Sequence, residues 1–201
     1  RHEFNAENIK PRDLHETYLV PFEALVKEGK VKEVMCAYNR LEGDPCCGSD
    51  RLLMQILRQE WGYEGIVLSD CGAIDDFYRE KGHKTHPDAE SASAAAVLSG
   101  TDLECGSSYK ALVESAKKGL ISEKDIDVSV KRLLKARFEL GEMDDPSKVE
   151  WTKIPYSVVC SAEHDSLSLD IARKSMTLLL NKNNILPLKR GGQTIAVMGP
   201  N

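Results

Sequence analysis

The ends of three predicted strands are evenly spaced, and this spacing constrains the fold more than any other feature of the chain. Tyr38, Asp70 and Asp102 each lie near the end of a short apolar run, and 70 − 38 = 32 while 102 − 70 = 32. Between the runs, apolar residues recur with the period of a helix. Strands that alternate with helices at a constant period are typical of a parallel sheet. The sequence therefore predicts a parallel β/α architecture.

Two architectures of this kind fit the period. A (β/α)8 TIM barrel uses about 250 residues for its eight units, or roughly 31 for each. A doubly wound sheet is the alternative, but its Gly-x-Gly-x-x-Gly turn does not occur in this sequence. The chain has 201 residues, too few for eight units of this length. We therefore expect part of a TIM barrel, with about three βα units.

Helix signals place the other elements of these units. Pro21 should divide the first helix, and Ser49 is a candidate N-cap of the second. Ser122 and Asp125 resemble a capping box. The predicted strands cover residues 31–39, 66–70 and 99–104, the last being the weakest. The predicted helices cover residues 13–29, 50–61, 88–98, 108–118 and 122–140.

The character of the sequence changes after the third unit. Residues 141–155 are polar and contain prolines, which is typical of a linker. Ser161 then begins a predicted long amphipathic helix, and residues 195–199 predict the first strand of a new domain. That helix is expected to carry Leu167, Ile171, Met176 and Leu179-Leu180. We expect barrel residues at 1–140, a linker with a long helix at 141–190 and the start of a second α/β domain at 191–201, so that the sequence is a fragment.

Polar residues at the predicted strand ends are the candidates for chemistry, because active sites of β/α barrels lie at the carboxyl ends of the strands. Asp70 follows four strand residues directly, and its alternative role is to cap the next helix or to pair with a neighbouring base. Tyr38 either donates to a substrate or to Asp70, or packs its ring in the core. Glu104 either lines a pocket or faces solvent. Asp102 is expected to be structural, in a Gly-Thr-Asp turn.

Cysteines follow two of these strand ends. Cys71 and Cys105 lie just beyond consecutive strands, which are neighbours about 4.8 Å apart in a barrel. This separation suits a disulfide, while two free buried thiols are the alternative. Cys46-Cys47 lies in a loop and could bond elsewhere, and Cys36 and Cys160 are expected in the core.

Several classes of function and ligand are disfavoured. With 27 Lys+Arg against 32 Asp+Glu the chain lacks the basic surplus of a nucleic-acid-binding protein. No apolar run reaches the ~18–20 residues of a membrane helix. His83 and His86 lack an evident third ligand, so we expect neither a metal nor another cofactor. Asp75-Asp76 is expected to be a solvated face or a helix start.

Five segments, in the same order along the chain, resemble the motifs of glycoside hydrolase family 3. The segment from Val67 to Asp70, preceded by Trp61 to Gly65, resembles the nucleophile motif of this family. The other four are MCAYN at 35–39, GTDLE at 100–104, LLLNK at 178–182 continuing to the LPL at 186–188, and IAVMGPN at 195–201. The resemblance covers essentially the whole chain and places it in the C-terminal part of the family's barrel, with the first strand of its α/β sandwich domain.

The resemblance implies roles for individual residues. Asp70 would be the catalytic nucleophile on the seventh barrel strand, with Tyr38 on the sixth and residues 100–104 on the eighth. Arg1-His2 would follow the fifth strand, where the family places basic residues that bind sugar. Cys71 would occupy the position after the nucleophile, which is commonly Trp in glucosidase-like members and Cys in the xylosidase and arabinofuranosidase branch. Arg1, His2, Tyr38, Cys71 and Glu104 are therefore the candidate substrate-binding residues.

The implied activity is that of a retaining, exo-acting β-glycosidase that needs no cofactor. A β-xylosidase acting on oligosaccharides or on aryl and alkyl glycosides is favoured, with a β-glucosidase as the alternative. A non-catalytic carbohydrate-binding or structural remnant is a third hypothesis. The acid/base Glu usually comes from the second domain, so we expect the fragment itself to be inactive. Glu104 is the nearest local carboxyl group, but no motif assigns it that role.

Two further expectations concern the environment of the protein. Polysaccharide substrates and possible disulfides favour a periplasmic or secreted protein. An open part of a barrel would expose strand edges and an uncovered core face, which predicts self-association of the fragment.

Overall fold

The computed structural model describes residues 1–192, 194, 196 and 198. These residues form two compact units, Arg1–Val149 and Glu150–Asn201, and each is described by itself. The strand predicted at 195–199 depends on residues outside the described part of the chain. The start of a second domain at 191–201 therefore stays a prediction.

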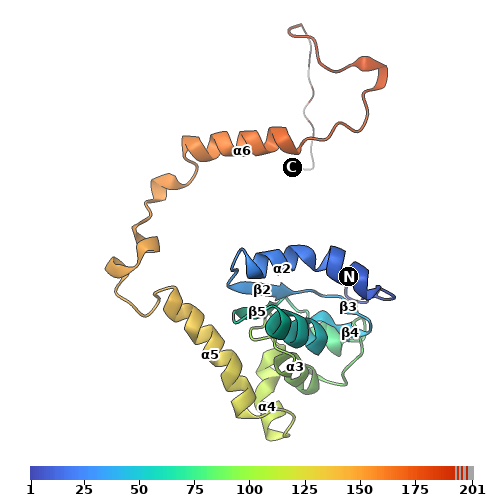
Figure 1. Cartoon of the computed structure of the whole chain (residues 1–201), viewed down its shortest axis with the longest axis vertical. Coiled ribbons are helices and arrows are strands. Elements are labelled where there is room, and N and C mark those ends of the chain that lie inside the picture. Colours follow the sequence, from blue (N-terminus) through green and yellow to red (C-terminus); the bar gives the residue numbers. More distant parts are fainter. Residues whose placement is uncertain (193, 195, 197, 199–201) are drawn as a thin grey trace. The chain divides into compact units, whose positions relative to one another are not determined.

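Parallel pairing at the centre of the first unit confirms the predicted β/α pattern (Figure 1). Strand β2 (Glu33–Cys36) pairs in parallel with β5 (Ile66–Ser69), in register from Glu33↔Ile66 to Cys36↔Ser69. The third predicted strand is reduced to one parallel bridge, Leu68↔Leu103, on the far side of β5. The carboxyl ends of all three segments therefore meet at one edge, although the sheet does not close into a barrel.

A second, smaller sheet was not predicted. Strand β1 (Asn5–Ala6) pairs in parallel with β3 (Arg40–Leu41), and β3 forms a hairpin with β4 (Asp44–Pro45). Strands of two residues are too short to show a periodicity. This sheet matters for function because it brings the start of the chain beside the segment that follows β2.

The helices of the first unit lie close to the predicted ranges. The predicted first helix is divided next to Pro21, into α1 (Pro11–Asp13), a π-helical turn η1 (Leu14–Tyr18) and α2 (Val20–Lys27). Ser49 Oγ accepts a bond from the Leu52 amide at the start of η3 (Arg51–Glu60), a π-helix. The remaining elements of this unit are η2 (Cys46–Gly48), η4 (Asp75–Phe77), α3 (Ala89–Leu98), η5 (Ser108–Ala111), α4 (Leu112–Lys117), α5 (Glu123–Glu139) and η6 (Pro146–Lys148). The predicted capping box of Ser122 and Asp125 is present at the start of α5.

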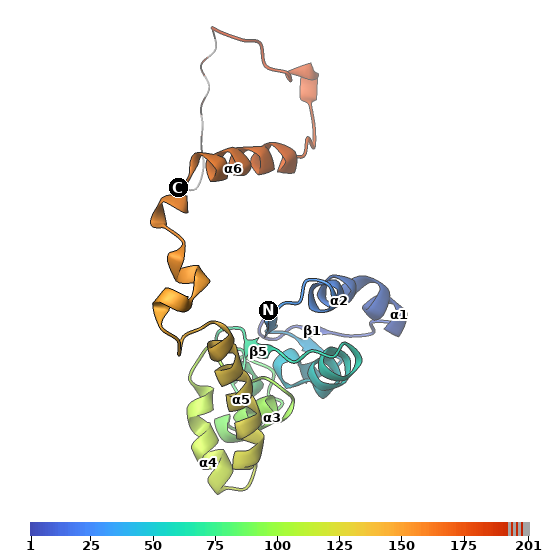
Figure 2. The same cartoon turned by 60° about the vertical axis from the view of Figure 1, so that its left-hand side comes forward.

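The core of the first unit lies between the parallel strands and the helices that connect them. It contains Val67 and Phe77 together with Leu57 of η3, all buried. Ala92 and Ala96 of α3 have small side chains and pack in this core with Ile74 and Phe77, the residues on either side of Asp75-Asp76. The helices α3, α4 and α5 lie beside one another in both views, on the side of the strands away from α2 (Figures 1 and 2).

Asp102 fixes the third strand segment through a buried ionic network, rather than through the turn predicted at Gly-Thr-Asp. Its carboxylate bonds to Arg58 of η3 at 2.7 Å and to Arg132 of α5 at 2.7 Å. It also accepts bonds from the Val67 amide at 2.9 Å and from Ser129 Oγ at 2.9 Å. The expected structural role is correct, but its chemistry differs, because the partners come from elements distant in the sequence.

An apolar hollow opens beside β2. It has a volume of about 1000 Å³ and lies between α2, β2 and η3. Tyr18, Leu25 and Met35 line it and remain more than half exposed, at 58%, 54% and 55%. β2 has no strand partner on this side among the described residues. This is the uncovered core face that an open part of a barrel predicts.

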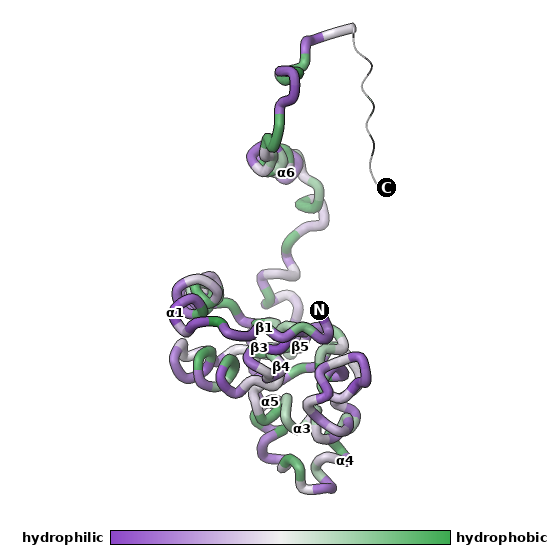
Figure 3. Tube along the Cα trace, turned by 90° about the vertical axis from the view of Figure 1, so that its right-hand side faces the viewer, coloured by the Kyte–Doolittle hydropathy of each residue, from purple (hydrophilic) through white to green (hydrophobic). Residues whose placement is uncertain are grey.

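The second unit contains one regular helix, α6 (Ala162–Ser175), and Ser161 Oγ caps it by accepting a bond from the His164 amide. The helix ends before Met176, so the predicted extension through Leu179-Leu180 is wrong. Figure 3 shows hydrophobic and hydrophilic residues mixed along α6, and its apolar side chains are exposed. Its other elements are η7 (Glu150–Lys153), η8 (Tyr156–Val158) and η9 (Lys182–Asn184). In the part of the chain that the structure describes, no helix is both long and apolar enough to cross a membrane.

Candidate active site

Asp70 lies at the carboxyl end of β5, where the chain leaves the strand in a tight turn. The Asp70 amide bonds to the carbonyl of Cys36 at 3.2 Å, which continues the parallel pairing to the strand end. The Cys71 amide donates to Asp70 Oδ1 at 2.7 Å and so fixes the carboxylate. Gly72 has a φ of 76°, a conformation that suits glycine, and allows this turn. Asp70 is only partly buried, so its carboxylate remains accessible.

Three other predicted site residues gather around Asp70. Tyr38 donates its hydroxyl proton to the Cys71 carbonyl at 2.6 Å. Desolvation and the neighbouring carboxylate of Asp70 raise the pKa of Tyr38. The guanidinium of Arg1 lies 4.3 Å above the Tyr38 ring, and the His2 ring contacts it edge-on at 4.8 Å. The pairing of β1 with β3 is what brings residues 1 and 2 to Tyr38.

A disulfide joins Cys71 and Cys105, so the predicted bridge is confirmed. Their Cα atoms are 4.4 Å apart. Two further bonds connect the same loops: the Gly72 amide donates to the Cys105 carbonyl at 2.7 Å, and the Cys105 amide donates to Ser69 Oγ at 3.0 Å. Cys71 is exposed, so the bridge forms part of the rim beside Asp70.

Glu104 is bound to the turn that follows it. One carboxylate oxygen accepts from the Ser108 amide at 2.8 Å and the other from the Tyr109 amide at 2.6 Å. Both oxygens therefore cap η5. Glu104 therefore holds the turn that follows it, rather than bonding to Asp70 or Tyr38.

The predictions for the other cysteines need correction. Cys36 lies in the core as predicted, but it also forms a disulfide with Cys47, 11 residues further along the chain, with Cα atoms 5.1 Å apart. Cys46 is a free, buried thiol, whereas Cys160 is exposed rather than in the core. Cys36 is the last residue of β2, and the loop that contains Cys47 returns to this end of the strand. A cysteine at a strand end was therefore the sequence feature that could have indicated this second bridge.

Asp75 and Asp76 are buried, at 5% and 4% exposure, so the prediction of a solvated face is wrong, although η4 does start at Asp75. Ile74 and Phe77 are inserted in the core on either side of them and draw the turn inward. Asp75 accepts bonds from Ser108 Oγ and from Tyr78, and it pairs with Arg79. Asp76 Oδ2 lies 2.6 Å from His2 Nδ1.

His83 and His86 pack against the ring of Phe77, with centroids 6.1 Å and 5.4 Å from it. Burial lowers the pKa of both imidazoles, so the neutral forms are favoured. Among the described residues no group of three His, Cys, Asp or Glu side chains could hold a metal ion.

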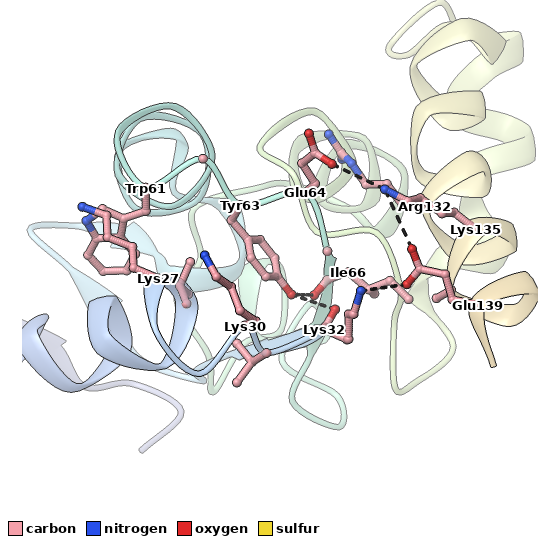
Figure 4. Close-up of a pocket in the computed structure, with 15 residues that line it drawn as sticks. Lys27, Lys30, Lys32, Trp61, Tyr63, Glu64, Ile66, Arg132, Lys135 and Glu139 are labelled. Atoms are coloured by element: carbon pink, nitrogen blue, oxygen red, sulfur yellow. Dashed lines mark hydrogen bonds and ion pairs between the residues drawn. The ribbon is translucent and has the colours of Figure 1, made fainter. Parts of the chain in front are cut away.

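A second hollow, of about 260 Å³, lies at the opposite ends of the strands (Figure 4). Its charged residues are largely paired with one another. Lys32 bonds to Glu139 at 2.9 Å, and Lys135 lies 3.4 Å from Glu64. The Tyr63 hydroxyl lies within bonding distance of the Lys32 and Ile66 carbonyls, at 2.9 Å and 2.8 Å. In β/α folds this amino-terminal face serves stability, so we place the candidate active site at Asp70.

The site is a carboxylate at the carboxyl end of a parallel strand with Tyr38, Arg1 and His2 beside it, and active sites of β/α enzymes lie at this end of the strands. The sequence matches the glycosyl hydrolase family 3 N terminal domain over residues 1–136, and the chain belongs to this family. The family resemblance of the sequence motifs is thereby confirmed.

Relatives extend this comparison over the whole chain. It is 56% identical to a xylan 1,4-beta-xylosidase of Xylanibacter ruminicola and 37% identical to beta-D-xylosidase 1 of Arabidopsis thaliana, each alignment covering 100% of the chain. It spans only 23% and 26% of the length of these two relatives.

Solved structures agree on the fold. A GH3 exo-beta-xylosidase bound to a xylobiose aziridine activity-based probe superposes with a TM-score of 0.81 at 29% identity, covering 94% of this chain and 24% of that one. A beta-glucosidase of Listeria innocua bound to isofagomine gives 0.78 at 28% identity, covering 92% and 25%. The chain thus has a mixed α/β fold that aligns with part of these family 3 structures.

Proposed function

We propose that the chain carries the nucleophile of a retaining, exo-acting β-xylosidase that hydrolyses terminal non-reducing β-D-xylosyl residues. In this proposal residues 1–140 are the C-terminal part of a TIM barrel, with about three βα units. The observation that carries the proposal is the position of Asp70, fixed by the Cys71 amide at 2.7 Å and open at the carboxyl edge of the strands.

The chemistry follows a double displacement. Asp70 Oδ2 attacks the anomeric carbon, the bond to the leaving oxygen breaks, and a covalent glycosyl-enzyme forms. Water then adds at the same carbon, releases Asp70 and gives a product with retained configuration. A second carboxyl group, about 5–5.5 Å away, protonates the leaving oxygen and later deprotonates the water. Glu104 is already engaged in capping η5, so we assign that group to a part of the enzyme outside these 201 residues.

The substrate class is inferred from the rim of the site. The bridge between Cys71 and Cys105 occupies the position beside Asp70, and a hexose must place its hydroxymethyl group somewhere along this rim. A pentose lacks that group and therefore needs less space beside the bridge. Arg1, with the orientation of its guanidinium set by the Tyr38 ring, is the candidate donor to a sugar hydroxyl. Both named relatives above are xylosidases, which supports the same substrate.

Covalent trapping tests the proposal. The full-length enzyme is incubated separately with an activated 2-fluoro-xyloside and a 2-fluoro-glucoside, and intact masses are measured. The tryptic peptide from Gln59 to Arg79 is then mapped. A label on Asp70 that forms faster with the xyloside is the expected result, and Asp70→Asn should take up no label.

A β-glucosidase is the second candidate, supported by the structural match to the Listeria innocua enzyme. Faster labelling by the glucoside would favour it over a xylosidase. No label from either sugar, in a folded protein, would favour a non-catalytic remnant of the family.

The two disulfides support an oxidising location, in the periplasm or outside the cell. Fractionation of the source cells, with activity or antibody detection of the full-length protein, tests this part of the proposal.

A further inference from the structure

Asp76 is a buried carboxylate close to the candidate site that the proposed mechanism does not use. It lies in η4, six residues after Asp70 (76 − 70 = 6), and is 4% exposed. A buried carboxylate is costly unless it is hydrogen-bonded or paired. Its side chain reaches back to the start of the chain, where Oδ2 lies 2.6 Å from Nδ1 of His2.

The hydrogen bonds of His2 define its tautomer. Nε2 of His2 accepts a bond from Nε of Arg1 at 3.2 Å. Because that nitrogen is an acceptor, the ring proton sits on Nδ1, from which it is donated to Asp76. Asp76 thereby fixes both the orientation and the proton position of the imidazole, as carboxylates do for histidines in many active sites.

We propose that Asp76 is a positioning residue that acts through His2 to hold Tyr38 and Arg1 beside Asp70. This inference rests on the proposed function for its effect on catalysis. The His2 ring meets Tyr38 edge-on at 4.8 Å, and Arg1 covers the same ring at 4.3 Å. The bond to Asp76 is the one contact that ties the His2 ring to the buried core in the described part of the chain, since Arg1 and Tyr38 are the groups that the ring itself orients.

The main chain and the side chain of Asp76 bond to different partners, so the role of the side chain can be tested by itself. Its carbonyl accepts a bond from the His83 amide at 2.5 Å and so holds the loop that follows η4. A substitution of the side chain leaves this bond intact. Effects on loop structure and effects on His2 can therefore be separated.

A double-mutant cycle in the full-length enzyme tests the inference, with an aryl β-xyloside and an aryl β-glucoside as substrates. Asp76→Leu should lower kcat/KM about tenfold to hundredfold, since small misplacements of site groups have effects of this size. Asp76→Asn keeps an oxygen acceptor for Nδ1–H and should restore most of the activity. In a His2→Phe background, Asp76→Leu should add little further loss, because the interaction it removes is already gone.

The inference would be overturned if the double variant lost kcat/KM by the product of the two single losses, which is the result for independent residues. It would also be overturned if Asp76→Asn were no more active than Asp76→Leu. Glu80→Gln, an exposed carboxylate in the same loop, is the control and should keep full activity. If Asp76→Leu does not fold, Asp76→Ala, which also removes the acceptor, takes its place in the cycle. His2 is 45% exposed, and its own substitution should lower kcat/KM by the same tenfold to hundredfold.

Crystal structures of the variants give a readout that does not depend on activity. The His2 ring should leave Tyr38 in Asp76→Leu and should stay in place in Asp76→Asn. An unmoved His2 ring in Asp76→Leu would overturn the inference. If the wild-type enzyme hydrolyses neither substrate, the proposed function fails, and these structures still decide whether Asp76 positions His2.

Discussion

Asp102 shows how one side chain can connect four parts of this fold. Its carboxylate is fully buried and bonds to two guanidiniums, one amide and one hydroxyl. Arg58 contributes a side chain that is only 6% exposed, and burial lowers its pKa, although Asp102 opposes that shift. An intact buried ion pair stabilises a fold little more than apolar residues of similar volume would. Removing one partner, however, lowers the stability strongly, because the other charge stays buried without a partner.

Asp102→Asn is therefore expected to lower the free energy of unfolding by about 3–5 kcal/mol, because Arg58 is left as an uncompensated buried charge. The measurement is urea denaturation of the full-length protein, followed by fluorescence. Glu64→Gln is the control, since Glu64 is 84% exposed and pairs with Lys135 at the surface. A loss below 1 kcal/mol for Asp102→Asn would show that the network is dispensable.

The two free thiols differ sharply in their surroundings. Burial raises the pKa of Cys46 from its usual 9.0 to about 11, whereas Cys160 is exposed. At pH 8 this shift leaves about a hundredfold less thiolate at Cys46. Since the thiolate is the reactive form, a disulfide reagent should titrate Cys160 rapidly and Cys46 only after unfolding. Mass spectrometry of the native labelled protein checks this, and prompt labelling of Cys46 would contradict it.

At the scale of elements, the sequence predicted what depends on regular patterns. The spacing of Tyr38, Asp70 and Asp102 placed the carboxyl ends of three strand segments together, and the structure confirms this for β2, β5 and the bridge at Leu103. Start signals such as the capping box at Ser122 were equally informative because they depend on local hydrogen bonds.

Features that depend on distant partners were not predictable in this way. Asp75 and Asp76 resemble solvated residues in sequence, and only the insertion of Ile74 and Phe77 into the core buries them. The β1–β3 pairing has no pattern of its own, yet it is what delivers His2 to Asp76. The position of Asp70 at its strand end was therefore predictable from the sequence, whereas the burial of Asp75 and Asp76 was not.

The two disulfides are expected to have different functions. Cys71–Cys105 closes a loop of 34 residues and Cys36–Cys47 one of 11, which corresponds to about 4 and about 3 kcal/mol of stability in the chain-entropy account. Replacing Cys71 and Cys105 by Ser should also raise the glucoside-to-xyloside ratio of kcat/KM, because the rim beside Asp70 widens. Replacing Cys36 and Cys47 by Ala should lower stability without changing that ratio. Equal ratios in both double variants would contradict the assignment of the rim bridge to specificity.

The whole molecule presents an apolar surface that a larger assembly would cover. Leu25 and Met35 line the hollow of about 1000 Å³ and are each more than half exposed. β2 also has a free edge on this side within the described residues. Exposed strand edges beside apolar surface promote association between chains. The relatives are about four times longer than this chain, and in a closed barrel the neighbouring strand would occupy this position.

Met35→Lys is consequently expected to reduce self-association of the isolated chain but to destabilise the full-length protein. The isolated 201-residue chain should bind the dye ANS and form oligomers in sedimentation velocity, and Met35→Lys should reduce both by placing a charge in the hollow. In the full-length protein the same substitution should lower the melting temperature, since an unpaired charge would then be buried. Val113→Lys is the matched control, because Val113 is 62% exposed on α4 and does not line the hollow, and it should change neither property. A monomeric isolated chain without ANS binding would contradict the first expectation, and a full-length protein whose melting temperature is unchanged by Met35→Lys would show that this face of β2 is solvent-exposed there.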